Sequence, residues 1–311
     1  MGLLVNGQWQ DQWYDTSKNK GEFKRENVKF HQVISPDPKA EFPAEAKRYH
    51  LYVSLACPWA HRTLIFRKLK KLDSLIEVSI VHPHMLENGW ELKSGLGATG
   101  DRLYNLKFLH QLYTKAVPDY TGRVTVPVLW DTQKETIVSN ESAEIIRQFN
   151  SSFNALTGDP QDFYPQALRA DIDQINERIY HTVNNGVYRC GFATSQDAYK
   201  QAFLELFDTL DFLESHLSGR DYLIGEQLTE ADWRLFTTLI RFDAVYFGHF
   251  KTNRQRIMDY PHLFAYLKRL YHYPGIAETV NFEHIKQHYY YSHRMINPTQ
   301  IVPEGPLLYL D

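Results

Sequence analysis

The sequence predicts an α/β domain followed by an all-helical domain. Strand patterns and helix patterns alternate in the first half of the chain, whereas the second half is helical in its periodicity almost throughout. With 311 residues, the chain is long enough for two domains that each bury a core. A stretch rich in Ser, Asn, Gly and Pro, residues 150–165, is predicted to link them.

The first half has the element order of a thioredoxin-like domain. Four runs have the composition of strands: His50–Ser54, Ile76–Val81, Val126–Trp130 and Thr136–Val138. A helix pattern over residues 61–72 predicts a right-handed crossover between the first two strands. Residues 131–134 are expected to form the hairpin turn between the last two, and a helix follows.

The second half contains regular helix signals. Apolar residues spaced by three or four predict one amphipathic helix; they are Leu204, Phe207, Leu210, Leu213 and Leu217. Thr229 and Asp232 form a capping box that starts another helix, and a third helix is expected near Tyr260. We therefore predict a thioredoxin-like domain over 46–150 and a helical domain with an extended tail over 163–311.

The first 45 residues, with many Lys, Asn and Pro, are predicted to form an extended arm. Four aromatic residues, Trp9, Trp13, Tyr14 and Phe23, suggest that this arm packs on the body of the protein.

The stretch Cys57-Pro58-Trp59-Ala60 lies where the first strand ends and the first helix begins. The free N–H groups and the positive dipole end of a helix favour a thiolate there, so Cys57 is a candidate nucleophile. Ala60 replaces the second cysteine of a two-cysteine redox motif. Cys57 must therefore exchange with an external thiol such as glutathione.

Composition excludes several other classes of function. The net charge of −3 and the pI near 6.5 argue against nucleic-acid binding. Two cysteines, Cys57 and Cys190, suit a reducing compartment, and the cytoplasm fits best. No apolar run approaches the ~20 residues that cross a bilayer, and no signal-peptide or myristoylation pattern is recognised at the N-terminus.

Two further motifs indicate binding of a thiol peptide. Val126-Pro127 lies at the start of a strand, where a cis proline would present the preceding backbone N–H and C=O to the peptide. Glu141-Ser142 starts the helix after the hairpin, where a hydroxyl and free N–H groups can hold a carboxylate and the Glu an ammonium. A helix-capping role alone is the alternative for this pair.

These motifs, together with residues 184–193, resemble the Xi-class glutathione transferases, the glutathionyl-hydroquinone reductases. The resemblance covers nearly the whole chain, including an insertion at residues 82–122 and a tail that begins at Gln287. It implies a homodimer, with glutathione as co-substrate, glutathionyl-hydroquinones as substrates and no tightly bound cofactor.

The resemblance also implies roles for individual residues. Cys57 would be the nucleophile, Tyr188 the proton donor, and Tyr246 and Tyr289 the phenols near the thiolate. Because Tyr290 and Tyr291 follow Tyr289 directly, the sequence leaves open which of these three tyrosines lies near Cys57. The residues implied to hold glutathione are Trp90, Arg123, Val124, Thr125, Val126, Glu141 and Ser142.

The sequence leaves two other functions open. One is a general thiol transferase or dehydroascorbate reductase that uses Cys57 without aromatic specificity. The other is a non-catalytic, transferase-like binding module. Cys190 is expected to be structural. The pairs His82/His84 and His284/His288 have no third ligand at suitable spacing, so we expect no metal site.

Overall fold

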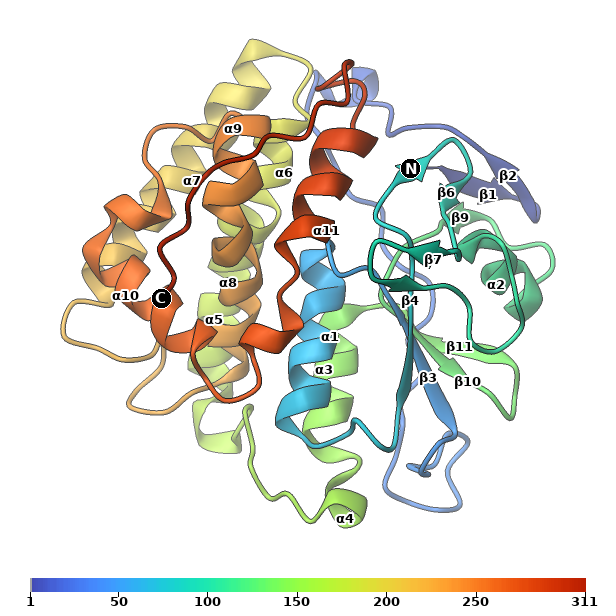
Figure 1. Cartoon of the computed structure of the whole chain (residues 1–311). Coiled ribbons are helices and arrows are strands. Elements are labelled where there is room, and N and C mark those ends of the chain that lie inside the picture. Colours follow the sequence, from blue (N-terminus) through green and yellow to red (C-terminus); the bar gives the residue numbers. More distant parts are fainter. Residues whose placement is uncertain (1) are drawn as a thin grey trace. The chain divides into compact units, whose positions relative to one another are not determined.

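A computed structural model describes residues 2–311 and divides the chain into two compact units (Figure 1). The first unit contains the stretch that ends at Trp13, residues 26–161 and residues 278–292. The second unit contains residues 14–25, 162–277 and 293–311. Met1, the first residue of the predicted arm, lies outside the described residues. The arm contributes to both units.

The first unit is built on a sheet with the strand order β11-β10-β3-β4. These strands are β3 (Tyr49–Val53), β4 (Glu77–Ile80), β10 (Val128–Asp131) and β11 (Thr136–Ser139). The pair β3 and β4 is parallel and connected through α1 (Pro58–Leu69), whereas β10 runs antiparallel to both of its neighbours. This is the predicted thioredoxin-like arrangement, with the predicted strands shifted only at their ends.

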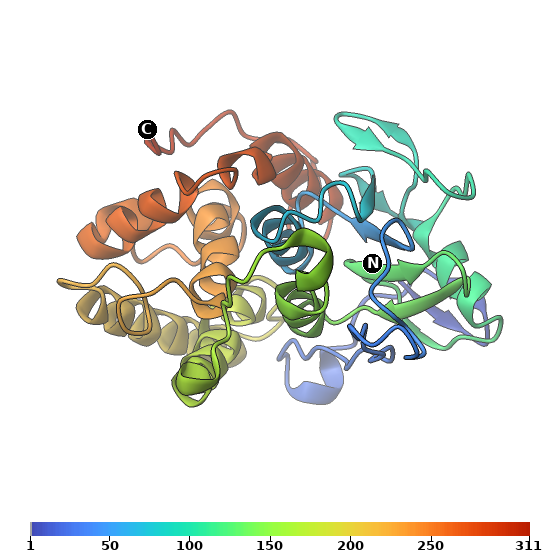
Figure 2. The same ribbon diagram turned by 90° about the horizontal axis from the view of Figure 1, so that it is seen from below.

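Helices α1 and α3 (Ser142–Ser151) pack side by side on one face of this sheet (Figures 1 and 2). Their contact is apolar, because α1 buries Ile65 and Phe66 and α3 buries Ile145 and Phe149. Helix α2 (Leu109–Ala116) belongs to the same unit and contacts β11. The sheet and its helices therefore fix the ends of β3 and β11, from which α1 and α3 begin.

The N-terminal stretch forms a hairpin that we did not predict. Strands β1 (Leu3–Val5) and β2 (Gln8–Gln10) pair with each other, and β1 also pairs with β9 (Gly122–Arg123). The turn at Asn6-Gly7 has positive φ angles of 48° and 75°. The packing of the aromatic residues is confirmed, since Trp9 stacks on His110 with a centroid distance of 4.8 Å.

Short hairpins and helices complete the first unit. The insertion contains β5 (Met85–Leu86), β6 (Gly89–Trp90), β7 (Ser94–Gly95) and β8 (Ala98–Thr99). The predicted linker contains a short helix, α4 (Asn154–Thr157). The tail forms α11 (Phe282–Lys286), which continues into a π-helical turn, Gln287–Tyr291.

The second unit is helical. Its α-helices are α5 (Arg169–Ile179), α6 (Gly186–Gly191), α7 (Gln196–His216), α8 (Glu230–Arg241), α9 (Phe247–His249) and α10 (Pro261–Tyr271). Every residue of α8 is buried, and α8 packs against α5 and α10. The predicted capping box is confirmed, because the Thr229 N–H donates to Asp232 Oδ2 at 2.8 Å. No helix in residues 2–311 is long and apolar enough to span a membrane.

The predicted apolar stripe of α7 is partly wrong. Leu210 and Leu213 are fully buried, but 58% of Leu204 is exposed. The buried stripe instead continues through Leu206 and Ala202, at the i, i−4 spacing that keeps one face of a helix turned inward. Leu204 lies outside this face.

Candidate active site

Cys57 is the N-cap residue of α1. Strand β3 ends at Val53, and the Cys57 N–H donates to the Ser54 carbonyl at 3.2 Å. The Cys57 carbonyl then accepts the first helical bond, from His61 N–H at 3.0 Å. Pro58 occupies the first helical position, where its missing N–H costs nothing. The thiol is half-buried and stands at the positive end of the helix dipole.

The predicted Val126-Pro127 motif lies beside this thiol. The Val126-Pro127 peptide bond is cis. Cys57 Sγ lies 3.7 Å from the Val126 carbonyl oxygen, to which the S–H group donates. The structure thus brings together two of the predicted site residues, Cys57 and Val126, although they are 69 positions apart in the sequence.

The backbone of Thr125 is held by Tyr113, a residue that the sequence analysis missed. The Tyr113 hydroxyl donates to the Thr125 carbonyl at 2.8 Å and accepts from the Thr125 N–H at 3.2 Å. It also accepts from Asn140 Nδ2 at 3.1 Å. Asn140 directly precedes Glu141-Ser142, so one buried phenol joins the two predicted glutathione-binding segments. The apolar spacing of α2 made Tyr113 indistinguishable from a packing residue.

Glu141 is the N-cap of α3. Its Oε1 accepts from the Ala143 N–H at 3.0 Å and from the Ser142 hydroxyl at 3.3 Å. Arg62 of α1, which is 1% exposed, reaches the Ser142 hydroxyl at 3.5 Å and lies over the Trp59 ring at 4.6 Å. The capping interaction is therefore present, and Arg62 adds a buried positive charge next to Ser142.

Trp90 ends β6 and is almost fully buried. Its indole stacks on the His288 ring with a centroid distance of 4.8 Å and an interplanar angle of 24°. His288 Nδ1 in turn lies 2.9 Å from the Pro83 carbonyl oxygen. The tail therefore holds the face of Trp90 through His288.

The three consecutive tyrosines of the tail have different surroundings. Tyr289 is buried, with 1% of its surface exposed. Burial raises the pKa of the half-buried Tyr290. Tyr291 stacks on His84 with a centroid distance of 3.8 Å. Tyr291 thus has a clear packing role, while Tyr289 belongs to the interior of the first unit.

The remaining residues of the predicted glutathione-binding segment have interactions within the first unit. Arg123 Nε donates to Glu26 Oε1 at 3.2 Å, and its Nη atoms donate to the carbonyl oxygens of Gln12 and Trp13. Val124 is 3% exposed. The guanidinium of Arg123 thus joins β9 to the N-terminal stretch.

The second unit contains Tyr188 and Tyr246 in an aromatic cluster. Their ring centroids are 6.0 Å apart. Tyr188 contacts Phe250 at 5.4 Å, and Tyr246 stacks on Phe250 at the same centroid distance, with an interplanar angle of 14°. Phe192 lies 5.0 Å from Phe250 and completes this cluster. Tyr188 is 8% exposed and Tyr246 is fully buried.

All three predicted tyrosines lie in or near π-helical turns. Tyr180–Asn184 precedes α6, which carries Tyr188; Tyr246 ends the turn Phe242–Tyr246; and Tyr289 lies within Gln287–Tyr291. Asn184, Asn185 and Gly186 are residues that commonly interrupt a helix. The chain remains helical there, and the extra residue of the wider turn is what disturbs the sequence periodicity. Such turns occur frequently at functional sites.

Cys190 has the environment of a structural thiol. It is 2% exposed, and burial raises its pKa to about 12. A thiol that retains its proton is a poor nucleophile at neutral pH.

The paired histidines are engaged with carbonyl and aromatic groups. His284 Nε2 lies 2.5 Å from the Leu96 carbonyl oxygen, and the rings of His82 and His84 meet edge to face at 4.9 Å. Within residues 2–311, no three His, Cys, Asp or Glu side chains form a group that could hold a metal ion.

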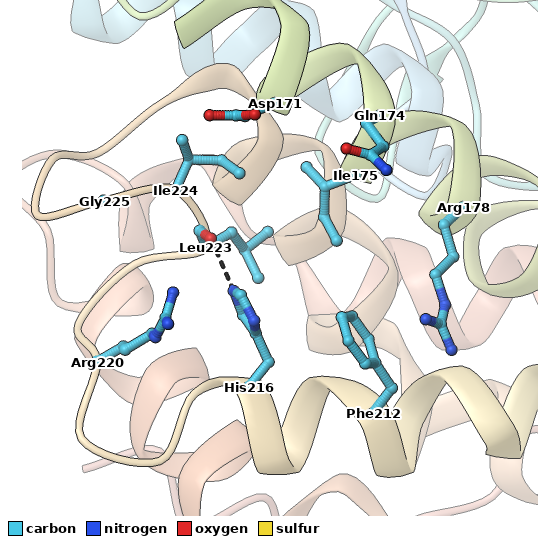
Figure 3. Close-up of a pocket in the computed structure, with 10 residues that line it drawn as sticks. All are labelled: Asp171, Gln174, Ile175, Arg178, Phe212, His216, Arg220, Leu223, Ile224 and Gly225. Carbon is cyan, nitrogen blue, oxygen red and sulfur yellow. Dashed lines mark hydrogen bonds between the residues drawn. The ribbon is translucent and has the colours of Figure 1, made fainter.

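A separate hollow of about 450 Å³ lies in the second unit (Figure 3). It is bounded by α5, the C-terminal part of α7 and the loop at residues 220–225. His216 closes one side, where its Nε2 lies 2.8 Å from the Leu223 carbonyl oxygen. The residues predicted for catalysis or glutathione binding do not line it.

Comparison with known proteins assigns both halves of the chain. Residues 56–152 match the glutathione S-transferase N-terminal domain, and residues 196–269 match the glutathione S-transferase C-terminal domain. The crystal structure of the glutathione S-transferase Xi from Phanerochaete chrysosporium is 52% identical, with a TM-score of 0.90 over 93% of this chain and 94% of that one. This chain belongs to the Xi class of glutathione transferases.

Other relatives match over nearly their full lengths. The glutathionyl-hydroquinone reductase YqjG of Escherichia coli is 56% identical over 100% of this chain and 97% of its own. The structure of YqjG with glutathione bound superposes with a TM-score of 0.91 over 99% of this chain and 97% of that chain. The Xi-class transferase of Natrialba magadii is 46% identical, with a TM-score of 0.93 over 100% of this chain and 95% of that chain.

Proposed function

We propose that this Xi-class transferase is a glutathionyl-hydroquinone reductase. The observation that carries the chemistry is Cys57, a half-buried thiol at the N-cap of α1 and 3.7 Å from the Val126 carbonyl. The substrate class rests on the 56% identity, over the whole chain, to the reductase of Escherichia coli. The overall reaction converts a glutathionyl-hydroquinone and glutathione into hydroquinone and oxidised glutathione.

The first step forms a bond between two sulfur atoms. The Cys57 thiolate attacks the sulfur that joins glutathione to the ring, and the carbon–sulfur electron pair leaves with the ring carbon. A proton from the Tyr188 hydroxyl converts this carbanion equivalent into the hydroquinone, and solvent returns the proton to Tyr188. Cys57 is left in a mixed disulfide with glutathione.

The second step restores the thiolate. The sulfur of a second glutathione attacks the glutathione sulfur of the mixed disulfide, so that oxidised glutathione leaves and Cys57 carries the electron pair. This external thiol performs the role of the resolving cysteine that Ala60 replaces. The buried Cys190, whose pKa is raised to about 12, is not needed for this step.

Glutathione is proposed to bind along the cis Val126-Pro127 motif and at the N-terminus of α3. The backbone N–H and C=O groups of Val126, beside the cis proline, suit the cysteinyl part of the tripeptide as an added strand. Ser142 and the adjacent Arg62 suit the γ-glutamyl carboxylate, and Glu141 suits its ammonium. Trp90, Arg123, Val124 and Thr125 complete the proposed binding set. Tyr246 and Tyr289 are proposed to donate hydrogen bonds that favour the thiolate.

We further propose a homodimer in the cytoplasm with no tightly bound cofactor. The two cysteines are both free thiols, which suits a reducing compartment.

Turnover of two substrates by three proteins tests this function. We expect the wild-type protein to reduce a glutathionyl-hydroquinone faster than the mixed disulfide of glutathione and 2-mercaptoethanol. Cys57→Ser should lower kcat for both substrates by at least about a thousandfold, because a hydroxyl at neutral pH is a far weaker nucleophile than a thiolate. Cys190→Ser is the matched control and should retain turnover.

Two outcomes would contradict the proposal. A strong preference for the mixed disulfide would support the general thiol transferase instead. Full activity in Cys57→Ser would remove Cys57 from the chemistry.

A further inference from the structure

Arg25 lies over the face of Tyr188 in the second unit. The guanidinium carbon is 4.5 Å from the centroid of the Tyr188 ring. Arg25 Nε also donates to Asn185 Oδ1 at 2.9 Å. Asn185 separates the π-helical turn Tyr180–Asn184 from α6, which carries Tyr188. One side chain of the N-terminal stretch thus contacts both the proposed proton donor and the side chain of Asn185, which directly precedes α6.

The residues before Arg25 are firmly attached to the same region. Phe23 is 2% exposed, and its ring contacts Phe192 at 5.3 Å and Tyr14 at 4.8 Å. The Gly21 carbonyl accepts from the Thr194 N–H at 2.9 Å, and the Lys20 carbonyl accepts from the Ser195 hydroxyl at 2.8 Å. These contacts, made just after α6, fix the direction from which Arg25 reaches Tyr188.

A cation on the face of a phenol has a direct chemical effect. The π system attracts the guanidinium, and this attraction grows when the hydroxyl loses its proton, because the ring then carries negative charge. A phenol in this position gives up its proton more readily. A hydroquinone carbanion is therefore protonated faster, since a general acid becomes more effective as its acidity approaches the working pH.

The described ionisable groups beside this cluster are a phenol, a paired arginine and two buried histidines. Tyr246 is the titratable residue that faces Tyr188 from the turn Phe242–Tyr246. On α6, Arg189 pairs with Glu205 of α7 at 2.6 Å and with Glu22 of the N-terminal stretch at 3.6 Å. Beyond Phe250 lies His249, whose pKa burial lowers to about 4, next to His293. Arg25 is a cation in direct contact with the Tyr188 ring.

We propose that Arg25 is a positioning residue that orients Tyr188 and strengthens it as a proton donor. This inference rests on the proposed function, in which Tyr188 protonates the departing ring. It assigns the N-terminal stretch a part in the aromatic half of the reaction. The thiol half, carried by Cys57, does not depend on Arg25.

The test compares Arg25→Gln and Arg25→Lys with the wild-type protein on two substrates. We expect Arg25→Gln to lower kcat for a glutathionyl-hydroquinone about tenfold with little change in KM, and Arg25→Lys to recover part of the loss. Turnover of the glutathione–mercaptoethanol mixed disulfide, which needs no proton on a ring carbon, should stay within about twofold. Lys24→Gln removes the neighbouring exposed cation and is the matched control.

The pH profile provides the decisive readout. Tyr188 must be protonated to act as an acid, so activity falls as the pH rises through its titration. Loss of Arg25 makes the phenol hold its proton more tightly, and the alkaline limb of kcat for the glutathionyl-hydroquinone should move to higher pH in Arg25→Gln. A merely structural role would not move this limb.

Failure of this inference can be told apart from failure of the proposed function. Equal losses on both substrates, or an unchanged kcat and alkaline limb in Arg25→Gln, would overturn the role of Arg25. Tyr188→Phe tests the proton donor independently of Arg25. If Tyr188→Phe is inactive on the glutathionyl-hydroquinone while Arg25→Gln has normal activity, only the role of Arg25 is wrong. If Tyr188→Phe is fully active, the proposed proton donor itself is wrong.

Discussion

At the scale of single residues, two buried histidines should make the stability of the fold depend on pH. His50 of β3 is 1% exposed and lies 2.8 Å, through Nε2, from the Ser79 hydroxyl. His249 is 5% exposed and lies 3.2 Å from His293. Burial disfavours the imidazolium and lowers the pKa of each to about 4. In the unfolded chain both should titrate near the ordinary value of about 6.5.

We therefore predict that acid destabilises the protein between about pH 6.5 and pH 4. In this range the unfolded chain binds protons that the native protein excludes, so the free energy of unfolding falls as the pH falls. Each histidine contributes up to about 1.4 kcal/mol per pH unit. Urea denaturation at pH 7, 6 and 5 measures the slope. His249→Gln should flatten it, whereas His181→Gln, at an exposed histidine, should not.

A wild-type stability that is constant from pH 7 to pH 5 would contradict these lowered pKa values. The same would hold if His249→Gln and the wild-type protein lost stability in parallel.

Single residues also show which site features a sequence can predict. Cys57 was predictable because strand, cysteine, proline and helix follow one another directly in the chain. The contact between Cys57 and Val126 required the thioredoxin-like topology as well, because it joins β10 to the end of β3. Arg62 could not be predicted to lie at Ser142, since this contact joins two helices whose residues are 80 positions apart in the sequence.

At the scale of elements, the π-helical turns were the least predictable feature. A five-residue turn shifts the apolar pattern by one position, and short sequences do not distinguish that shift from a break. The asparagines and glycine near residue 185 therefore have the sequence pattern of a helix break, although the chain is helical there. The packing of Trp90 on His288 was likewise hidden, because it joins the insertion to the distant tail.

Tyr113 connects elements that are far apart in the sequence. It projects from α2 and binds the backbone before β10 and the side chain of Asn140 before α3. Burial raises its pKa, so its hydroxyl keeps its proton and can donate to the Thr125 carbonyl. Both segments that it joins belong to the proposed glutathione site.

We predict that Tyr113→Phe raises the KM for glutathione several-fold with a smaller effect on kcat. The variant leaves buried groups of Thr125 and Asn140 without the hydroxyl, which should lower the free energy of unfolding by about 1–3 kcal/mol. Tyr49→Phe is the matched control, because the buried Tyr49 hydroxyl donates to the Pro43 carbonyl at 2.6 Å. Steady-state kinetics and urea denaturation of both variants test this.

Both variants should lose stability, but only Tyr113→Phe should change the KM. An equal KM in the two variants would show that Tyr113 does not organise glutathione binding.

At the scale of the whole molecule, each compact unit is built from segments that are far apart in the sequence. The thioredoxin-like and helical parts were predictable from the change in periodicity, and the fold class is confirmed. The exchange of terminal segments between the two units was not predictable from the sequence. Residues 14–25 join the second unit and residues 278–292 join the first, because their aromatic side chains pack there. Local patterns predict such elements but not their partners.

The proposed reaction uses residues of both units. The first unit carries Cys57, Tyr289 and the proposed glutathione-binding residues, and the second carries Tyr188, Tyr246 and Arg25. Protonation of the ring is assigned to residues of the second unit, whereas the proposed thiolate-stabilising phenols, Tyr246 and Tyr289, come from both.

Mass spectrometry of Cys57 tests the central claim most directly. The protein is mixed with one equivalent of a glutathionyl-hydroquinone in the absence of free glutathione, quenched in acid and analysed both intact and as peptides. We predict a glutathione adduct on the peptide that contains Cys57, together with an equal amount of free hydroquinone. An unmodified Cys57 beside intact substrate, or an adduct on Cys190 instead, would contradict the proposed mechanism.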